Sequence, residues 1–393
     1  MAKLFSEKSA GHALAFRVED SPRATAASIN SLLARASSRW SGIVNGEARS
    51  FLTDQHLEIC VEAIMNHSIC DTNIEILDGF FEFLVSHVAK GSKGQYFTPR
   101  QIIDCCVKIM DPAPTESVLD PACGSGGFLV HVLNHNSHRI KMPLREYCAK
   151  YLWGCDFDRR AIQIAKALML VSGDGSTNLH QLNSLFTETP TDLLEVAADG
   201  VPKLTIEDLL RSKTRKFPGF DVVLTNPPFA GEIKERSLVH RYQLSKKNRR
   251  MERDVLFLER CVQLLRPGGR LGIVLPHNKF AGASWAYLRE WLVRNMRIVS
   301  VLGLDRHTFL PHTHQKTSVL FGVKRPKPIL RPEGEPVLFT VSESSGKDST
   351  GRIRERPGVS FIQTAWERAD HDLDSVVAHF RDFTREHDVG WGS

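Results

Sequence analysis

The sequence lacks any apolar run that approaches the roughly 20 residues needed to cross a bilayer. Its first residues also lack the apolar segment of a signal peptide, with Glu7 and Lys8 placed early. Neither sign of charge is scarce, since 51 Lys and Arg residues stand against 45 Asp and Glu residues, for a formal net charge of +6. We therefore expect a soluble, cytoplasmic protein with no membrane partner, whose positive charge permits a polyanionic partner.

A second absence concerns disulfide and metal chemistry. None of the eight cysteines belongs to a C-x-x-C pair, and most of them lie in apolar settings. This pattern predicts reduced thiols in the core rather than a disulfide framework or a zinc site. His307, His312 and His314 have no cysteine or carboxylate partners at ligand spacing, so we interpret them as part of a surface loop and predict no metal.

The first 92 residues contain no glycine-rich motif and are predicted to form a small helical domain. Apolar residues recur at helical spacing over residues 24–40, 54–66 and 73–89. Two roles stay open for this domain. It is either a structural cap on the rest of the chain or a surface that docks another subunit or faces DNA.

The motif GQYFTPR, residues 94–100, precedes a helix that we predict over residues 101–110. Thr98 is expected to cap this helix, with Pro99 at its first position. A helix start of this kind offers free N–H groups to a carboxylate. Alone it is an ordinary cap, but it lies directly before a second motif, which gives it functional weight.

The second motif, DPACGSGGFL, joins a strand predicted over residues 117–120 to a helix that ends near residue 135. Its glycines at 124, 126 and 127 allow the backbone to pass close to a ligand, as in nucleotide-type sites. No G-K-[S/T] follows the glycines, which excludes a phosphate loop. The motif therefore indicates a ligand site without a Walker-type phosphate cradle.

The next two strands each end in a polar residue. The first, over residues 151–156, ends in Asp156, an acid suited to the two hydroxyls of a ribose, and Asp158 is expected to cap the helix that follows. The second, over residues 178–182, is followed by Asn183. Residues 186–216 are polar, and we interpret them as an insertion with a short helix over residues 206–211.

The third motif is the turn Asn226, Pro227, Pro228 and Phe229, which ends a buried strand predicted over residues 220–225. The prolines hold the backbone rigid at the carboxyl end of the strand, where open α/β sheets bind ligands. The Asn226 amide oxygen and the Pro227 carbonyl can both accept hydrogen bonds from one planar amino group, and Phe229 can lie against its ring. Standing alone, the motif would more simply be a proline-rich turn with a core Phe.

Lys and Arg are dense over residues 234–253, and the cluster includes Lys246, Lys247, Arg249 and Arg250. A solvated face and a set of phosphate contacts are equally good interpretations. Helices and strands then alternate and close in an apparent hairpin, which predicts a mostly parallel sheet with helices on both faces. These later elements are predicted at helices 254–265, 285–295 and 373–386 and at strands 271–275, 298–302 and 317–323.

The three motifs, in this order, resemble those of γ-type amino-methyltransferases of DNA, and most closely the modification subunits of type I restriction-modification systems. The resemblance covers residues 74–323 and extends to the tail around residues 370–383. It implies a Rossmann-like class I methyltransferase fold with a C-terminal antiparallel hairpin and S-adenosylmethionine as cofactor. It divides the chain into a helical N-terminal domain (1–92), a catalytic domain (93–328) and a C-terminal linker with a helical tail (329–393).

The resemblance also implies the site residues. Asn226, Pro227, Pro228 and Phe229 would hold the target adenine. The cofactor would be held by Gln95, Tyr96, Phe97, Thr98, Asp120, Cys123, Gly124, Ser125, Gly126, Asp156, Phe157 and Asn183. In this set Asp156 would bind the ribose hydroxyls and Phe157 would lie against the cofactor adenine. The family usually has Asp where Asn183 aligns, and Asn keeps a carbonyl acceptor.

The implied reaction is methyl transfer to the N6 amino group of an adenine that has been flipped out of double-stranded DNA. The motif contains no strong general base, so positioning and electrostatics are expected to dominate. Because no large region follows about residue 330, we expect a separate specificity subunit. A restriction subunit and a second modification subunit are further expected partners, in a restriction-modification or phage-defence system.

Three alternatives stay open. The NPPF motif by itself does not distinguish adenine N6 from cytosine N4, although the resemblance favours adenine. RNA adenine and a protein glutamine side chain are planar amines that the same turn could hold. A non-catalytic scaffold in a defence complex is a hypothesis of another class, and loss of cofactor binding would favour it.

Overall fold

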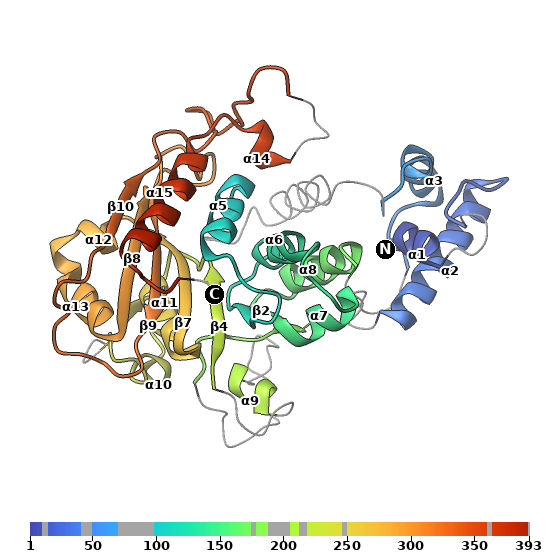
Figure 1. Ribbon diagram of the computed structural model, residues 1–393. Helices are drawn as coiled ribbons and strands as arrows, with labels where there is room; N and C mark the ends of the chain where they lie inside the picture. Colours follow the sequence, from blue (N-terminus) through green and yellow to red (C-terminus); the bar gives the residue numbers. More distant parts are fainter. Residues whose placement is uncertain are drawn as a thin grey trace.

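The computed structural model of the chain describes residues 1–9, 15–40, 49–69, 98–173, 178–187, 205–211, 218–245, 250–359 and 364–391. In these residues an eight-stranded sheet has helices on both faces (Figure 1). The strand order is β10-β8-β9-β7-β4-β1-β2-β3. The strands are β1 Val118–Asp120, β2 Leu152–Asp156, β3 Asn178–Gln181, β4 Phe220–Thr225, β7 Leu265–Pro276, β8 Met296–Gly303, β9 Thr317–Lys324 and β10 Leu338–Val341. Separately, β5 Glu232–Ile233 pairs with β6 Met251–Glu252.

The helices fall into an N-terminal group, a group around the sheet and a C-terminal pair. The first group is α1 Ala2–Lys8, α2 Pro22–Arg39 and α3 Asp54–Ile64. The second is α5 Arg100–Met110, α6 Gly127–Asn136, α7 Leu144–Tyr151, α8 Arg159–Val171, α9 Ile206–Arg211, α10 Arg236–Val239, α11 Arg253–Leu264, α12 Asn278–Ala281 and α13 Ala286–Asn295, with a 3-10 turn at Ala283–Trp285. The last pair is α14 Ala365–Arg368 and α15 Leu373–Glu386.

The direction of the strands confirms the predicted Rossmann-like sheet. All neighbouring pairs are parallel except those of β9, which runs antiparallel between β7 and β8. The chain reverses its order of strands around β1, which has β2 on one side and β4 on the other. A crevice at such a switch point is where open α/β sheets bind ligands. The carboxyl ends of β1, β2 and β4 therefore define the place for a site.

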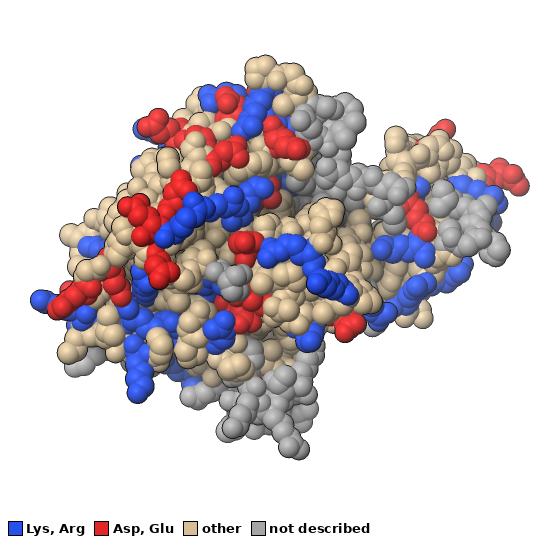
Figure 2. Space-filling view, viewed as in Figure 1, with Lys and Arg blue, Asp and Glu red and all other residues tan. Residues whose placement is uncertain are grey.

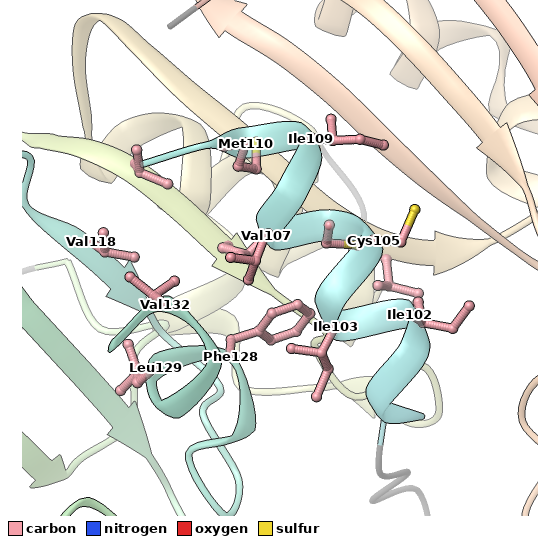
Figure 3. Packing of buried hydrophobic residues seen from close by; sticks show 14 of the residues in the cluster. Ile102, Ile103, Cys105, Val107, Ile109, Met110, Val118, Phe128, Leu129 and Val132 are labelled. Atoms are coloured by element: carbon pink, nitrogen blue, oxygen red, sulfur yellow. The ribbon is translucent and has the colours of Figure 1, made fainter. Parts of the chain in front are cut away.

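The sheet separates two apolar layers, because successive side chains of a strand point to opposite faces. In β4, Val222 and Leu224 join the layer formed with α5, α6, α8 and α15, whereas Val223 joins the layer formed with α11 and α13. Figure 3 shows the first layer, where Ile103 and Val107 of α5 approach Phe128 of α6. This packing fixes α5, which begins at Arg100, the last residue of the GQYFTPR motif.

The N-terminal helices pack on one another around a third apolar cluster, which includes Ile29 and Leu32 of α2 and Leu57 of α3. Leu170 of α8 belongs to the same cluster, so α8 lies against the N-terminal helices. The helices predicted over residues 24–40 and 54–66 are confirmed as α2 and α3. The helix predicted over residues 73–89 lies outside the described residues.

Helix α7 and strand β10 are among the elements around the sheet that were not predicted from the sequence. Helix α7 directly precedes β2, and the strand predicted over residues 151–156 included only Tyr151, the last residue of this helix. Strand β10 lies in the segment interpreted as a proline-rich linker and extends the sheet through parallel pairing with β8. The predicted helices over residues 206–211 and 373–386 are confirmed as α9 and α15.

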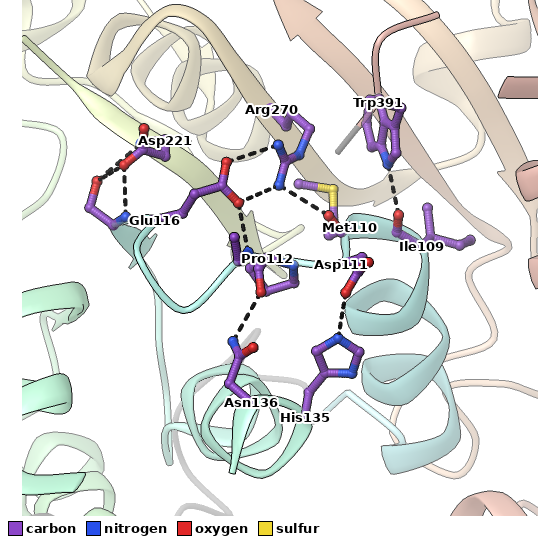
Figure 4. Close-up of polar contacts among 12 residues, drawn as sticks. Ile109, Met110, Asp111, Pro112, Glu116, His135, Asn136, Asp221, Arg270 and Trp391 are labelled. Atoms are coloured by element: carbon purple, nitrogen blue, oxygen red, sulfur yellow. Dashed lines mark hydrogen bonds and ion pairs between the residues drawn. The ribbon is translucent and has the colours of Figure 1, made fainter. Parts of the chain in front are cut away.

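The end of α5 is fixed by polar contacts from several elements (Figure 4). Trp391 donates its indole N–H to the Ile109 carbonyl at 2.7 Å, and Arg270 of β7 donates to the Met110 carbonyl at 3.2 Å. His135 of α6 contacts Asp111 at 2.7 Å, just beyond the helix. The last turn of α5 is thus held from the tail, the sheet and α6 together.

Among the described residues no helix has the length and hydrophobicity that crossing a bilayer requires. The seven described cysteines are free thiols, and all of them except Cys60 are buried. The predicted core thiols are therefore confirmed at Cys105, Cys106, Cys123, Cys148, Cys155 and Cys261, but not at Cys60.

Candidate active site

The glycine-rich loop between β1 and α6 is held by the backbone and side chain of β2. The Cys123 N–H donates to the Cys155 carbonyl at 2.9 Å, and the Gly124 N–H donates to Asp156 Oδ2 at 2.9 Å. Asp156 Oδ1 accepts from the Asp158 N–H at 2.8 Å. Burial raises the pKa of Asp156 to about 6. Each carboxylate oxygen keeps a second lone pair, so Asp156 can hold the loop and still accept from a ligand hydroxyl.

Two glycines of this loop need left-handed backbone, and their surroundings differ. Gly124 has φ +52, and a Cβ there would have no atom within 4 Å. Gly126 has φ +86, caps α6, and a Cβ there would lie 3.2 Å from the Cβ of Ala165. Gly126 therefore serves close packing against α8, whereas Gly124 leaves open space above the loop.

Asp120, at the end of β1, connects the loop to β4. Its side chain is 1% exposed and Oδ1 accepts from the Thr225 hydroxyl at 2.6 Å and from the Ala122 N–H at 3.1 Å. Burial raises the pKa of Asp120 to about 7. Thr225 directly precedes Asn226, so this hydrogen bond joins the two motifs. Sequence reasoning missed Thr225, although its place between a buried strand and the motif was visible.

The other residues expected at the cofactor lie around the loop. Cys123 and Ser125 are buried within it. Phe157 follows β2 with its side chain 51% exposed, one of few large apolar side chains on the surface of the described residues. Asn183 is half-buried, and its Oδ1 accepts from the Leu185 N–H at 3.1 Å within its own turn. Gln95, Tyr96 and Phe97 lie outside the described residues.

The Asn226 side chain is held by the residue that was expected to cap α5. Its Nδ2 donates to the Thr98 hydroxyl at 2.8 Å. The expectation that Thr98 caps the helix is wrong, because α5 begins at Arg100 with Pro99 as its N-cap and no side-chain cap. Pro99 has φ −56 and ψ 140, so it is the N-cap and not the first helical residue, and the Thr98 hydroxyl lies one residue too early for capping. That hydroxyl holds the acceptor turn instead.

Phe229, at the other end of the turn, is buried with 5% of its surface exposed. Its ring packs edge-on against Phe309, with centroids 5.9 Å apart and an interplanar angle of 76°. Phe309 lies in the connection between β8 and β9 and was not identified from the sequence. The turn is thus held at its first residue by Thr98 and at its last by Phe309.

A basic segment follows the turn. The described residues Lys234, Arg236, Arg241 and Arg250 are exposed, and β5 pairs with β6 to hold both ends of the segment together. In Figure 2, Lys and Arg side chains gather over the region of α10. Lys246, Lys247 and Arg249 lie outside the described residues.

Comparisons with known proteins give one consistent result. Residues 72–383 match the family model described as N-6 DNA Methylase. The StySPI methylase subunit of a type I restriction enzyme from Salmonella potsdam is 30% identical over 240 residues, which cover 60% of this chain and 41% of that protein. The EcoKI methylase subunit of a type I restriction enzyme from Escherichia coli K12 is 29% identical over 240 residues, with the same two coverages of 60% and 41%. This chain therefore spans about two fifths of the length of each relative.

The fold is also found among solved structures. The methyltransferase subunit of a type I restriction-modification system from Streptococcus thermophilus aligns with a TM-score of 0.62 at 15% identity. The alignment covers 91% of this chain and 70% of that chain. At this identity the likeness concerns the fold, and it agrees with the Rossmann-like sheet described above.

Proposed function

This chain belongs to the N-6 DNA methylase family, and from that premise we propose that it transfers a methyl group from S-adenosylmethionine to the N6 amino group of an adenine in DNA. The observation that carries the proposal is the position of Asn226. It follows β4 at the switch point of the sheet, and the hydrogen bond between Thr225 and Asp120 ties it to the glycine-rich loop. A methyl donor on the loop and an acceptor at the turn would therefore be neighbours.

The residues of the loop fit the proposed cofactor. The open space at Gly124 is a cradle that any side chain would fill. Phe157, whose ring is exposed, directly follows Asp156 at the end of β2. We assign the ribose hydroxyls to Asp156 and the adenine face to Phe157. Asp120, Cys123, Ser125 and Gly126 would shape the floor, and Asn183 and residues 95–98 would line its sides. The cofactor would supply an electrophilic methyl group on a sulfonium.

The turn supplies what an amino acceptor needs. With Nδ2 bound to Thr98, the plane of the Asn226 amide is fixed, and its Oδ1 is the atom that we assign to the adenine amino group. The Pro227 carbonyl would accept the second N–H. As the amino nitrogen gains a methyl group it becomes positively charged, so both carbonyl oxygens bind its N–H groups more strongly than before. Pro228 would keep the turn rigid.

We also propose the partners of this reaction. The exposed basic residues after the turn would contact DNA phosphates, since such contacts position a protein on the duplex without reading its sequence. Sequence recognition would come from a separate specificity subunit. A second modification subunit and a restriction subunit would complete the assembly, because two relatives named above are methylase subunits of type I restriction enzymes.

Transfer of tritiated methyl from S-adenosylmethionine to unmethylated genomic DNA tests the proposal. The protein is assayed alone and with its co-expressed neighbours, and the label is mapped to the modified base. We expect N6-methyladenine with wild-type protein. Asn226→Ala should lower transfer by a factor of about 1,000 or more, because it removes the acceptor that exists to orient the amino group.

Asn226→Asp is the matched control, because it keeps the size and an acceptor oxygen but cannot donate to Thr98. We expect it to keep cofactor affinity and to lose most of the transfer rate. Label on RNA or on protein glutamine, with none on DNA, would show that the acceptor is not DNA adenine. No label on any acceptor with cofactor binding intact would favour a scaffold role.

A further inference from the structure

The acceptor turn is held by two segments that are far apart in the sequence. Asn226 donates to Thr98, 128 residues earlier, and Phe229 packs on Phe309, 80 residues later. Thr98 directly precedes the N-cap of α5, and Phe309 lies in the loop after β8. If the two holders moved independently, the two ends of the turn would be positioned by unrelated parts of the protein.

A single residue of the chain after β9, here called the C-terminal tail (described residues 325–359 and 364–391), joins the two holders. Gln101, in the first turn of α5, donates its side-chain amide to the Ser345 carbonyl at 2.6 Å. Thr308, the neighbour of Phe309, contacts the Ser345 hydroxyl at 2.8 Å and the Asp305 carbonyl at 2.7 Å. Gln101, Thr308 and Ser345 are all buried. The contacts therefore form a closed ring from Asn226 through α5, the tail and the β8–β9 loop to Phe229.

The tail approaches α5 closely at this point, where Gly346 adopts a left-handed backbone conformation. Gly346 has φ +82, and a Cβ there would lie 2.8 Å from the Cβ of Ala369 and 3.6 Å from Gln101 Nε2. The other end of α5 is already fixed at Ile109, Met110 and Asp111 (Figure 4). The hydrogen bond from Gln101 to Ser345 thus holds the N-terminal end of α5, which adjoins Thr98.

We propose that Gln101, Thr308 and Ser345 are positioning residues for the acceptor turn, through which the C-terminal tail sets the orientation of Asn226. We assign none of the three a contact with the substrate. The inference rests on the proposed function for its effect on methyl transfer, whereas the coupling of the turn to the tail can be measured without any activity. In-line transfer is sensitive to position, since a displacement of about 1 Å can lower a rate by about 100-fold.

The test replaces Thr308 by Val, which keeps the shape and removes the hydroxyl. We expect kcat for DNA methylation to fall about tenfold, with the KM for DNA and the affinity for S-adenosylmethionine changed less than about twofold. Thr308→Ser, which restores the hydroxyl, should recover the rate. A general loss of folding would lower all of these quantities together and would not be rescued in this selective way.

Hydrogen exchange gives the second measurement, which needs no activity. In Thr308→Val the amides of Asn226, Phe229 and Ala230 should exchange at least about threefold faster than in wild type. Ser342→Ala is the matched control, because it removes another tail hydroxyl that contacts Asp372 at 2.6 Å outside the ring. It should leave exchange at the turn unchanged.

The outcomes separate the two claims. Unchanged exchange at the turn in Thr308→Val would overturn the positioning role, whatever the activity. Faster exchange with no methylation of DNA by wild-type protein would leave the positioning role in place and overturn the proposed function. If Thr308→Val does not fold, Gln101→Met repeats the test, since Met has a similar length but cannot donate to the Ser345 carbonyl.

Discussion

The glycine-rich loop and the acceptor turn lie at the same end of the sheet, yet they are held in different ways. The loop is fixed by the strand next to it in the sheet, because Cys123 and Gly124 donate to Cys155 and Asp156 of β2, 32 residues later. The turn is fixed by Thr98 and Phe309, which come from segments on either side of it in the chain. The loop is held mainly by β2, the next strand in the sheet, whereas the turn is held by segments 80 and 128 residues away in the chain.

This difference teaches where function can be damaged from a distance. The hydrogen bonds that hold the loop come from β2, an interior strand of the sheet, and the loop also packs on α8 at Ala165. A change in α5, in the β8–β9 loop or in the tail reaches the turn through one or two contacts. We therefore expect distant variants to affect transfer more often than cofactor binding.

The largest effect on cofactor binding is expected from a substitution that disrupts the loop itself. Gly124→Val fills the open space above the loop and forces a β-branched residue to φ +52, so we expect affinity for S-adenosylmethionine to fall at least about tenfold, equal to ~1.4 kcal/mol. Isothermal titration with the cofactor measures it. Gly126→Val is the matched variant on the packed side, against Ala165, and should lower the melting temperature further. Equal cofactor affinity in Gly124→Val and wild type would contradict the assignment of the cradle.

A second effect concerns stability rather than cofactor binding, and it arises at Asp120, which joins the loop to the turn. Its folded-state pKa of about 7 lies above the ordinary value of 3.8, so the folded protein binds the extra proton and loses stability as pH rises from about 4 to 7. Asp120→Asn cannot ionise and keeps the acceptor for Thr225. Relative to wild type, the variant should gain about 2 kcal/mol of unfolding free energy between pH 5.5 and pH 8. Urea unfolding of both proteins at pH 5.5 and pH 8 measures this difference. An equal change of unfolding free energy with pH in the two proteins would contradict the raised pKa of Asp120.

The smallest effect on stability is expected for Arg250, an exposed residue of the basic segment after the turn. Arg250 forms an exposed ion pair with Glu232 at 3.4 Å, so Arg250→Ala should change the unfolding free energy by less than about 0.5 kcal/mol. In the proposed DNA complex it should reduce the slope of log affinity against log salt by about one. Arg385→Ala removes a similarly exposed pair on α15 and serves as the control. An unchanged slope for Arg250→Ala would exclude it from the phosphate contacts.

Much of the fold was predictable from the sequence, since buried strands and amphipathic helices carry their own periodicity. The strands β2 and β4 and the helices α2, α3, α9, α11 and α15 were predicted within a few residues of their bounds. Strand β10 was missed because its four residues follow a proline-rich stretch, and its stability comes from pairing with β8. Helix α7 was missed because its eight residues give too short a pattern.

The sequence by itself determined the chemistry that the site offers. The loop glycines and the Asn226 turn are recognisable because each motif needs its residue types next to one another in the chain, and Asp156 is recognisable because it ends a buried strand. Only the tertiary structure decided that Thr98 binds Asn226 rather than its own helix, that Phe309 covers Phe229, and that Ser345 joins their supports. These contacts span 37 to 244 residues, and such pairings arise from the packing of distant segments, which local sequence patterns do not encode.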